Sequence, residues 1–137
     1  MRLDLTAKPN SSDTEFIRLK LREYNQRHVE CWPVQELAVF IRDDAKNITG
    51  GIVGLTWGNW FQTQLLWVEQ PLRGKGFGSQ LLLAAEREAK QRGCRFSIID
   101  TFSFQALEFY LQKGYEVEMT LDDFPVNQQR YYLTKEF

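Results

Sequence analysis

Residues 65–78 read Leu65-Leu66-Trp67-Val68-Glu69-Gln70-Pro71-Leu72-Arg73-Gly74-Lys75-Gly76-Phe77-Gly78, and this stretch decides the fold. An apolar strand ends at a proline, glycines alternate with cations, and a strongly helical segment follows. Glycine tolerates positive φ and lets a ligand approach the backbone closely. The N–H groups of such a turn, and those of the first helical turn, can converge on phosphate oxygens. Because Arg73 and Lys75 add positive charge, the stretch predicts a pyrophosphate-binding turn.

Two other glycine motifs are excluded by single residues. A dinucleotide fingerprint requires glycine where Ser79 stands, and a P-loop requires serine or threonine where Gly76 follows Lys75. Both failures count against a nucleotide-binding module that uses this turn for ATP. A glycine-rich turn that joins a strand to a helix and binds no ligand remains an alternative on this motif alone.

The pattern Arg-x-x-Gly-x-Gly at residues 73–78, after a strand with Leu66-x-Val68, resembles the acetyl-CoA-binding motif of the GCN5-related N-acetyltransferases (GNAT). A second segment, residues 103–115, is similar to the late helix of that family. Its matching positions are Ala106, Tyr110, Gly114 and Tyr115, while Ser103 replaces the usual Asn. The resemblance covers roughly residues 50 to 121, and residues 100–106 are similar to a branch of small, mostly uncharacterised bacterial acetyltransferases.

The resemblance implies acetyl-CoA as co-substrate and a site built mostly from backbone. The amide-rich pantetheine arm is expected to pair with the backbone of residues 66–68 like an added strand, and the pyrophosphate to bind the N–H groups of residues 73–78. The cofactor-binding positions carried over are Leu66, Trp67, Val68, Arg73, Gly74, Lys75, Gly76, Phe77, Gly78 and Ser103.

The chemistry implied by the family needs a polarised thioester carbonyl, a neutral amine and a proton for the departing thiolate. The backbone N–H near Val68 is the expected polariser, and Tyr110 occupies the position of the family's general acid. Core packing of an amphipathic helix is the alternative role for Tyr110. The base is open, because Gln62 and Ile98 stand where some members carry Glu; the candidates are Asp100, Glu69 and an ordered water.

Composition sets further limits. A chain of 137 residues with 43% hydrophobic and 26% charged residues is ordinary for one globular domain over residues 1–137. The sequence offers no apolar run for a bilayer and no signal-peptide core, so we expect a cytoplasmic protein without a membrane partner. Its net charge of −1 gives no reason to expect nucleic acid. Cys31 and Cys94 match no metal spacing, so no metal is expected.

Hydrophobic periodicity gives a coarse order of elements. We expect helices over residues 13–24 and 78–92, and a helix carrying Tyr110 that Ser103 caps. Leu81, Leu82, Ala85 and Ala89 form the apolar stripe of the second helix, and Glu86 belongs to its polar face. The expected strands are 37–42, 51–58, 62–69, 94–101, 115–121 and 129–134. This order predicts an α/β fold with a mixed, mostly antiparallel central sheet and helices on both faces.

The function that follows is an N-acetyltransferase that moves the acetyl group of acetyl-CoA to a primary amine of a small-molecule or peptide acceptor, by direct attack in a ternary complex. A non-catalytic acyl-CoA-binding sensor or scaffold is the alternative, favoured by the missing base. The aromatic residues Trp32, Trp57, Trp60, Phe61 and Phe124 are candidates for the acceptor pocket, for the core or for a dimer contact. A homodimer is a family-level expectation.

Overall fold

The computed structural model describes residues 1–30 and 33–137, so Cys31 and Trp32 lie outside the described residues. The chain separates into two compact units, residues 1–32 and 33–137. The expectation of a single domain stays a prediction. Across the described ranges, no helix combines the length and the apolar character that crossing a membrane requires.

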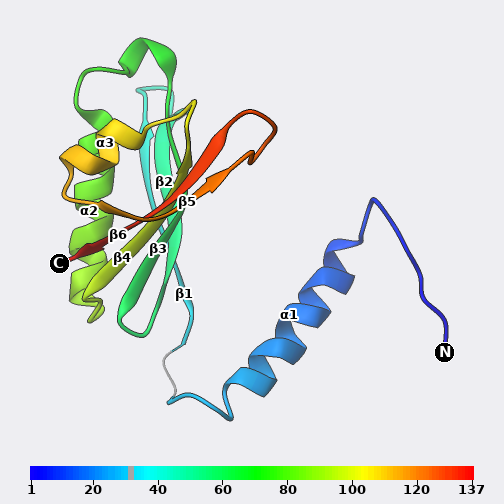
Figure 1. Cartoon of the computed structure of the whole chain (residues 1–137). Coiled ribbons are helices and arrows are strands. Elements are labelled where there is room, and N and C mark those ends of the chain that lie inside the picture. Colours follow the sequence, from blue (N-terminus) through cyan, green and yellow to red (C-terminus); the bar gives the residue numbers. More distant parts are fainter. Residues whose placement is uncertain (31–32) are drawn as a thin grey trace. The chain divides into compact units, whose positions relative to one another are not determined.

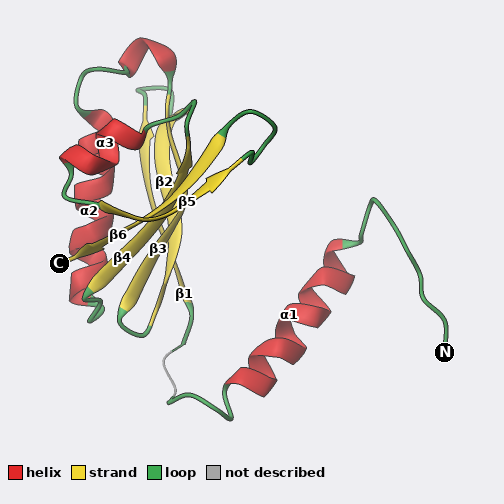
Figure 2. Cartoon of the chain, in the orientation of Figure 1, coloured by secondary structure: helices red, strands yellow, loops and turns green. Residues whose placement is uncertain are grey.

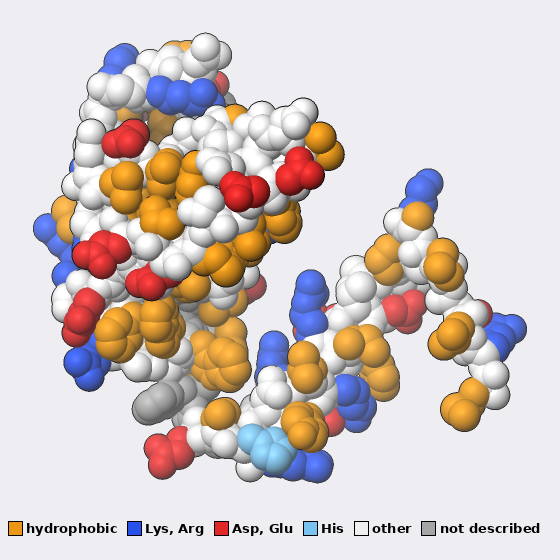
Figure 3. Space-filling model, viewed as in Figure 1, with side chains coloured by type: hydrophobic (Ala, Val, Ile, Leu, Met, Phe, Trp, Pro, Cys, Tyr) orange, Lys and Arg blue, Asp and Glu red, His pale blue; other side chains and the backbone are white. Residues whose placement is uncertain are grey.

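The first unit contains one long helix, α1 (Ser11–Asn25). It begins two residues before the expected start, so that Asp13 lies in its first turn, where a negative charge is favourable. The helix buries none of its side chains. Its apolar residues, visible as orange atoms along α1 in Figure 3, are therefore exposed: Phe16, Ile17, Leu19, Leu21 and Tyr24.

The second unit is a six-stranded sheet with two α-helices (Figures 1 and 2). Its strands are β1 (Gln35–Arg42), β2 (Ile48–Trp57), β3 (Trp60–Val68), β4 (Phe96–Phe102), β5 (Glu116–Asp122) and β6 (Gln129–Glu136). The strand order is β1-β2-β3-β4-β6-β5, and every neighbouring pair is antiparallel except β3 and β4. The mixed, mostly antiparallel sheet is confirmed. Helix cover on both faces stays a prediction, because α1 belongs to the other unit.

Helix α2 (Phe77–Gln91) packs its apolar stripe on β1, β2 and β3. Leu81, Leu82, Ala85 and Ala89 are all buried, as the 3.6-residue period predicts. The assignment of Glu86 to the polar face was wrong. Glu86 is only 4% exposed, and its carboxylate lies 2.9 Å from the ammonium group of Lys135 on β6. A buried carboxylate is tolerated here because an opposite charge pairs with it.

The parallel pairing between β3 and β4 is short. It joins residues 60–62 to residues 96–98 and ends there, so the remaining halves of the two strands separate. Over residues 63–68 and 99–102, the edges of β3 and β4 that face each other have no strand partner. On its opposite edge, β3 pairs with β2 and β4 pairs with β6. We call this opening the β3–β4 cleft.

Helix α3 (Leu107–Gln112) is shorter than predicted and is not capped by Ser103. Its N-cap is Ala106, which offers no side-chain acceptor. The chain before it forms a turn in which Thr101 and Gln105 bond to each other and to nearby backbone N–H groups. Phe109 of α3 lies beside Gly78 of α2, which places the two helices against each other.

Candidate active site

Two adjoining cavities define the candidate site. The first, of about 530 Å³, fills the β3–β4 cleft, and the second, of about 490 Å³, lies over residues 73–78, which we call the glycine turn. Six residues line both cavities and therefore mark the passage between them: Leu66, Trp67, Val68, Arg73, Ala106 and Tyr110. A long ligand with a phosphate end and a reactive end matches this arrangement.

The glycine turn has the geometry expected of a phosphate site. A short 3₁₀ helix (Gln70–Leu72) leads into it, and α2 begins directly after Gly76. Gly74 and Gly76 have φ of +75° and +86°, a region that side chains other than glycine rarely adopt. A Cβ at either position would meet no atom within 4 Å, so the space above the backbone is open. The N–H groups of the first turn of α2 have no partners within the helix and lie at its positive end.

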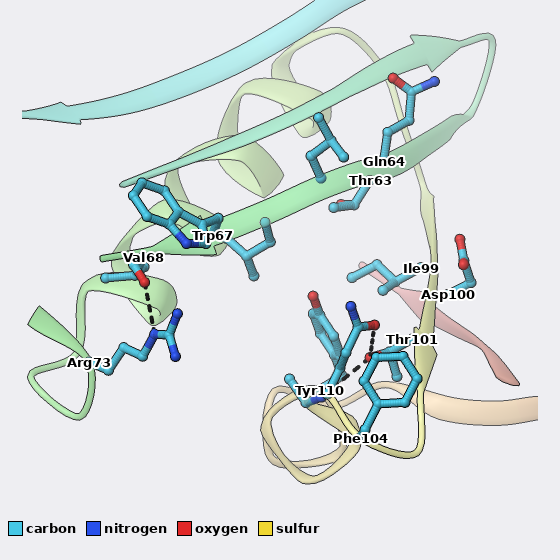
Figure 4. A pocket seen from close by; sticks show the side chains of 14 residues that line it. Thr63, Gln64, Trp67, Val68, Arg73, Ile99, Asp100, Thr101, Phe104 and Tyr110 are labelled. Carbon is cyan, nitrogen blue, oxygen red and sulfur yellow. Dashed lines mark hydrogen bonds between the residues drawn. The ribbon is translucent and has the colours of Figure 1, made fainter. Parts of the chain in front are cut away.

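The charge at the turn is positive. Figure 3 shows blue cationic side chains at the end of this unit that carries the turn between β3 and α2. The Nε of Arg73 donates to the carbonyl oxygen of Val68 at 2.9 Å (Figure 4), which fixes the guanidinium beside the passage. Lys75 is exposed and lines neither cavity. It therefore adds positive charge near the turn but is not part of the cavity walls.

The backbone of β3 alternates in direction, and this refines the expected pairing. The N–H of Glu69 donates to the carbonyl of Thr49, on the side of β2. Alternation therefore turns the backbone groups of Trp67 toward β2 and those of Leu66 and Val68 toward the cleft. Leu66 and the N–H of Val68 are able to pair with an extended arm, since the Val68 carbonyl already accepts from Arg73. Trp67, which is half-exposed, also lines both cavities.

Tyr110 rises from α3 into the cleft, opposite β3 (Figure 4). Its ring is 6% exposed and packs edge-on against the rings of Phe109 and Tyr115. Burial raises the pKa of Tyr110 to about 12, and the charge of Asp100 adds to the rise. The phenol is therefore protonated at neutral pH. Within residues 1–30 and 33–137 its hydroxyl has no hydrogen-bond partner, in contrast to that of Tyr115, which lies 2.7 Å from Ser97 Oγ.

Asp100 lines the cleft, but one of its oxygens is already occupied. Its Oδ2 accepts from Nε and Nη2 of Arg130 at 3.0 and 2.7 Å. The side chains of Ile99 and Asp100 leave β4 in opposite directions, as strand alternation requires, and that of Ile99 points toward Tyr110 (Figure 4). Glu69, the other carboxylate proposed as base, lines neither cavity.

Ser103 also lies outside both cavity linings. Its hydroxyl donates to Gln128 Oε1 at 2.6 Å and accepts from the N–H of Gln129 at 3.0 Å. It therefore ties the turn after β4 to the loop before β6. The structure gives no support to a contact between Ser103 and the coenzyme arm.

The aromatic residues proposed for an acceptor pocket lie in different parts of the structure. Phe61 is fully buried in the core, and Trp60 stacks on Phe96 where β3 and β4 are still paired. Phe124 lies 4.8 Å from the guanidinium carbon of Arg130, which also lies over Phe102 and Tyr132. Phe104, which stacks on Phe102, lines the cleft and is 61% exposed.

Sequence reasoning missed the polar residues Thr63, Thr101 and Gln105 in the cleft wall. Thr101 and Gln105 build the turn that presents α3, whereas Thr63 is buried and its hydroxyl has no partner in the described part of the chain. A signal for Thr63 was present, because strand alternation places it on the same face as Phe61, where an apolar residue is the norm.

The chain is similar to known acetyltransferases over most of its length. Residues 35–117 match the family described as acetyltransferase (GNAT) domain. An acetyltransferase of Agrobacterium fabrum is 36% identical over 121 residues, covering 88% of each chain, and the blasticidin-S acetyltransferase of Streptomyces morookaense is 34% identical over 79% of this chain and 80% of that protein. The crystal structure of an acetyltransferase from Agrobacterium tumefaciens superimposes with a TM-score of 0.93 at 34% identity and full coverage of both chains. The chain therefore belongs to the GNAT acetyltransferase family.

Proposed function

We propose that the protein transfers the acetyl group of acetyl-CoA to a primary amine. One observation carries this proposal: Tyr110 and Arg73 stand in the walls of both cavities, where the glycine turn meets the β3–β4 cleft. The pyrophosphate would be held by the glycine turn, with open space over Gly74 and Gly76. The pantetheine arm would pair with the cleft-facing backbone of Leu66 and Val68.

The reaction we propose is direct attack in a ternary complex. The amine nitrogen bonds to the carbonyl carbon, the carbon–sulfur bond breaks, and the thiolate takes a proton. Tyr110 supplies that proton, since its phenol is protonated at neutral pH and its hydroxyl faces the cleft without a partner in the described ranges. Its raised pKa makes the Tyr110 phenol a weaker acid than a phenol in water. Burial in the same cleft also raises the pKa of the coenzyme thiol, which reduces the pKa difference between the phenol and the thiol that takes its proton.

The acceptor we propose is a small molecule with a primary amine, with a peptide amine as the second possibility. Blasticidin-S is the substrate in the name of one relative, which supports a small acceptor. The wall of the cleft includes Phe104, whose ring is 61% exposed and can accommodate an apolar or flat group of the acceptor.

Thiol release over a library of amines is the test of turnover, measured with acetyl-CoA at saturation. We expect release to depend on one class of amine and to produce the N-acetylated product in equal amount. Release without an acetylated product would indicate hydrolysis, and it would contradict transfer to an amine.

The second candidate function is that of a non-catalytic acyl-CoA binder, which keeps the glycine turn but has no turnover. The engagement of Asp100 by Arg130, together with the absence of Glu69 from both cavity walls, favours it, because no unoccupied carboxylate group then stands ready to accept the proton of the amine. Calorimetry with CoA, combined with the amine screen, separates the two functions. CoA binding without thiol release for any amine supports the non-catalytic function.

A cytoplasmic location and a homodimer are further proposals, and light scattering of the purified protein tests the homodimer.

A further inference from the structure

Helix α1 has an apolar side that buries nothing in its own chain. Phe16, Ile17, Leu21 and Tyr24 lie within about 140° of the helix circumference. Each of them is between 57% and 65% exposed (Figure 3). A helix of 15 residues is only marginally stable alone in water, and most of its stability in a protein comes from packing of its apolar side. We therefore expect α1 to have a partner surface.

The sheet of the second unit presents apolar side chains on the face opposite α2, which we call the open face. Apolar residues of β1, β2 and β3 alternate between the two faces, and those toward α2 are buried. The strand register gathers the others in two neighbouring rows, Phe40–Gly51–Trp67 and Ala38–Val53–Leu65. Phe40, Leu65 and Trp67 are 47%, 65% and 50% exposed. Large apolar side chains that gather in this way on one face indicate a contact surface.

The open face continues toward β5 as a groove of about 480 Å³. The groove wall carries a stacked aromatic pair and three carboxylates, namely Trp60, Phe96, Glu116, Glu118 and Glu136. Lys135 also lines the groove, but its charge is paired with that of Glu86. On α1, Lys20 lies one turn from both Phe16 and Tyr24, and therefore on the apolar side of the helix. A cation within an apolar helix side complements carboxylates beside an apolar sheet face.

The dimensions of the two surfaces also agree. A helix of 15 residues is about 22 Å long, and neighbouring strands lie about 4.8 Å apart, so α1 is long enough to reach from the apolar rows to the groove. Its four apolar side chains each offer roughly 100 Å² of exposed surface. Two reciprocal contacts of this kind would bury on the order of 1,500 Å², counting both surfaces, which is the area that stable complexes typically bury.

We propose that α1 of one chain docks on the open face of a second copy, whose own α1 docks in return. Within a single chain, α1 buries no residue and the open face keeps its large apolar side chains exposed, so both surfaces lack cover until a second copy supplies it. The exchange closes as a two-fold symmetric dimer. This inference specifies the contact surface of the homodimer proposed above, and it does not depend on acetyl transfer.

Two leucines of α1 provide a matched pair of variants. Leu21 belongs to the apolar side, whereas Leu19 lies on the opposite side of the helix. Both are exposed within the chain, so neither substitution removes an internal contact. Leu21→Gln is expected to raise the Kd of the dimer by about 100-fold or more, because the lost burial counts at both contacts. Leu19→Gln is expected to change it by less than about 3-fold. Light scattering over a dilution series measures both, and equal effects overturn the inference.

A mixing experiment tests whether the helix is exchanged between copies. Phe40→Gln damages the open face and is also expected to weaken the dimer. In a mixture of the Phe40→Gln and Leu21→Gln variants, the intact α1 of the first can dock on the intact face of the second. Mixing is therefore expected to recover a dimer about 10-fold tighter than that of either variant alone. No recovery would mean that α1 packs on its own sheet or that like surfaces pair, and it would overturn the inference.

Molecular size decides this inference, and turnover decides the proposed function, so the two can fail separately. Thermal melts first establish that the variants are folded. A protein that stays monomeric at high micromolar concentration overturns both the inference and the homodimer. A dimer that Leu21→Gln and Phe40→Gln leave unchanged overturns the inference alone. If no amine is acetylated, the proposed function fails by that result, and the dimer measurements still decide where α1 docks.

Discussion

The glycine turn and the β3–β4 cleft are neighbours in space but are built in opposite ways. The turn is one continuous segment, residues 73–78, and it acts through its backbone. The cleft is assembled from β3, β4 and the segment that leads into α3, and its distinctive groups are the side chains of Thr63, Tyr110 and Asp100. A local segment can be recognised from a motif, whereas an assembled cleft depends on where the strands separate.

The difference also appears in how each region satisfies its polar groups. Open space over the turn leaves N–H groups available at the start of a helix. In the cleft, the buried hydroxyl of Thr63 has no partner among the described residues. We infer that the turn provides affinity and the cleft provides chemistry. Substitutions in the two regions test that division.

Removal of the Tyr110 hydroxyl tests the chemistry of the cleft. Tyr110→Phe is expected to lower kcat by about 100-fold or more and to leave CoA affinity and Tm nearly unchanged, since that hydroxyl bonds to no described residue. Tyr115→Phe is the matched control, because its buried hydroxyl pairs with Ser97 Oγ. It is expected to cost about 1–2 kcal/mol of stability and to keep turnover. Thiol-release assays and thermal melts measure both, and equal turnover in the two variants would remove Tyr110 from its role.

Alanine at a glycine of the turn tests whether the turn provides affinity. Gly76→Ala places a Cβ in the open space over the glycine turn, at a φ of +86°. Gly93, just beyond the other end of α2, has a φ of +94° and equally open surroundings, but it lines neither cavity. Both substitutions are expected to cost about 1–2 kcal/mol of stability. Only Gly76→Ala is expected to weaken CoA binding, by about 10-fold or more in calorimetry. An equal loss of CoA affinity in both variants would mean that backbone strain, and not contact with the glycine turn, causes the loss.

Alkaline unfolding tests the burial of the phenols beside the cleft. Burial raises the pKa of Tyr110 to about 12 and also raises that of Tyr115. Up to about pH 10 these phenols are neutral in both states; above it they ionise in the unfolded chain alone. Stability is therefore expected to fall by about 1.4 kcal/mol per pH unit for each phenol between about pH 10 and 12. Urea unfolding across this range measures the fall, and a Tyr110→Phe/Tyr115→Phe variant that falls as steeply would contradict it.

The smallest effect is expected at Asp100. Its pairing with Arg130 is partly exposed, so Asp100→Asn is expected to cost no more than about 1 kcal/mol. If water takes the proton of the amine, kcat changes by less than about 3-fold. A fall of 100-fold, with Tm unchanged, would make this carboxylate the base.

Local patterns predicted most elements of the sheet unit, because period and turn residues are encoded over short segments. The apolar stripe of α2 was found from spacing, and the start of that helix from the glycines. Glu86 was assigned to the wrong face, because its partner Lys135 lies 49 residues further along the chain. Ser103 was predicted to cap α3, but its hydroxyl bonds to a loop that only the fold brings near it.

By itself, the sequence determined the phosphate-binding turn, the helix that begins at it and the position of Tyr110 in the family motif, because each depends on residues a few positions apart. Only the tertiary structure decided where β3 leaves β4, which backbone groups of β3 face the opening, and which side chains stand in it. These depend on pairing between strands that are distant in sequence, and such pairing is set by the packing of the whole sheet. The unpartnered hydroxyl of Thr63 belongs to the second group, since an absent partner can be recognised only after all of its neighbours are known.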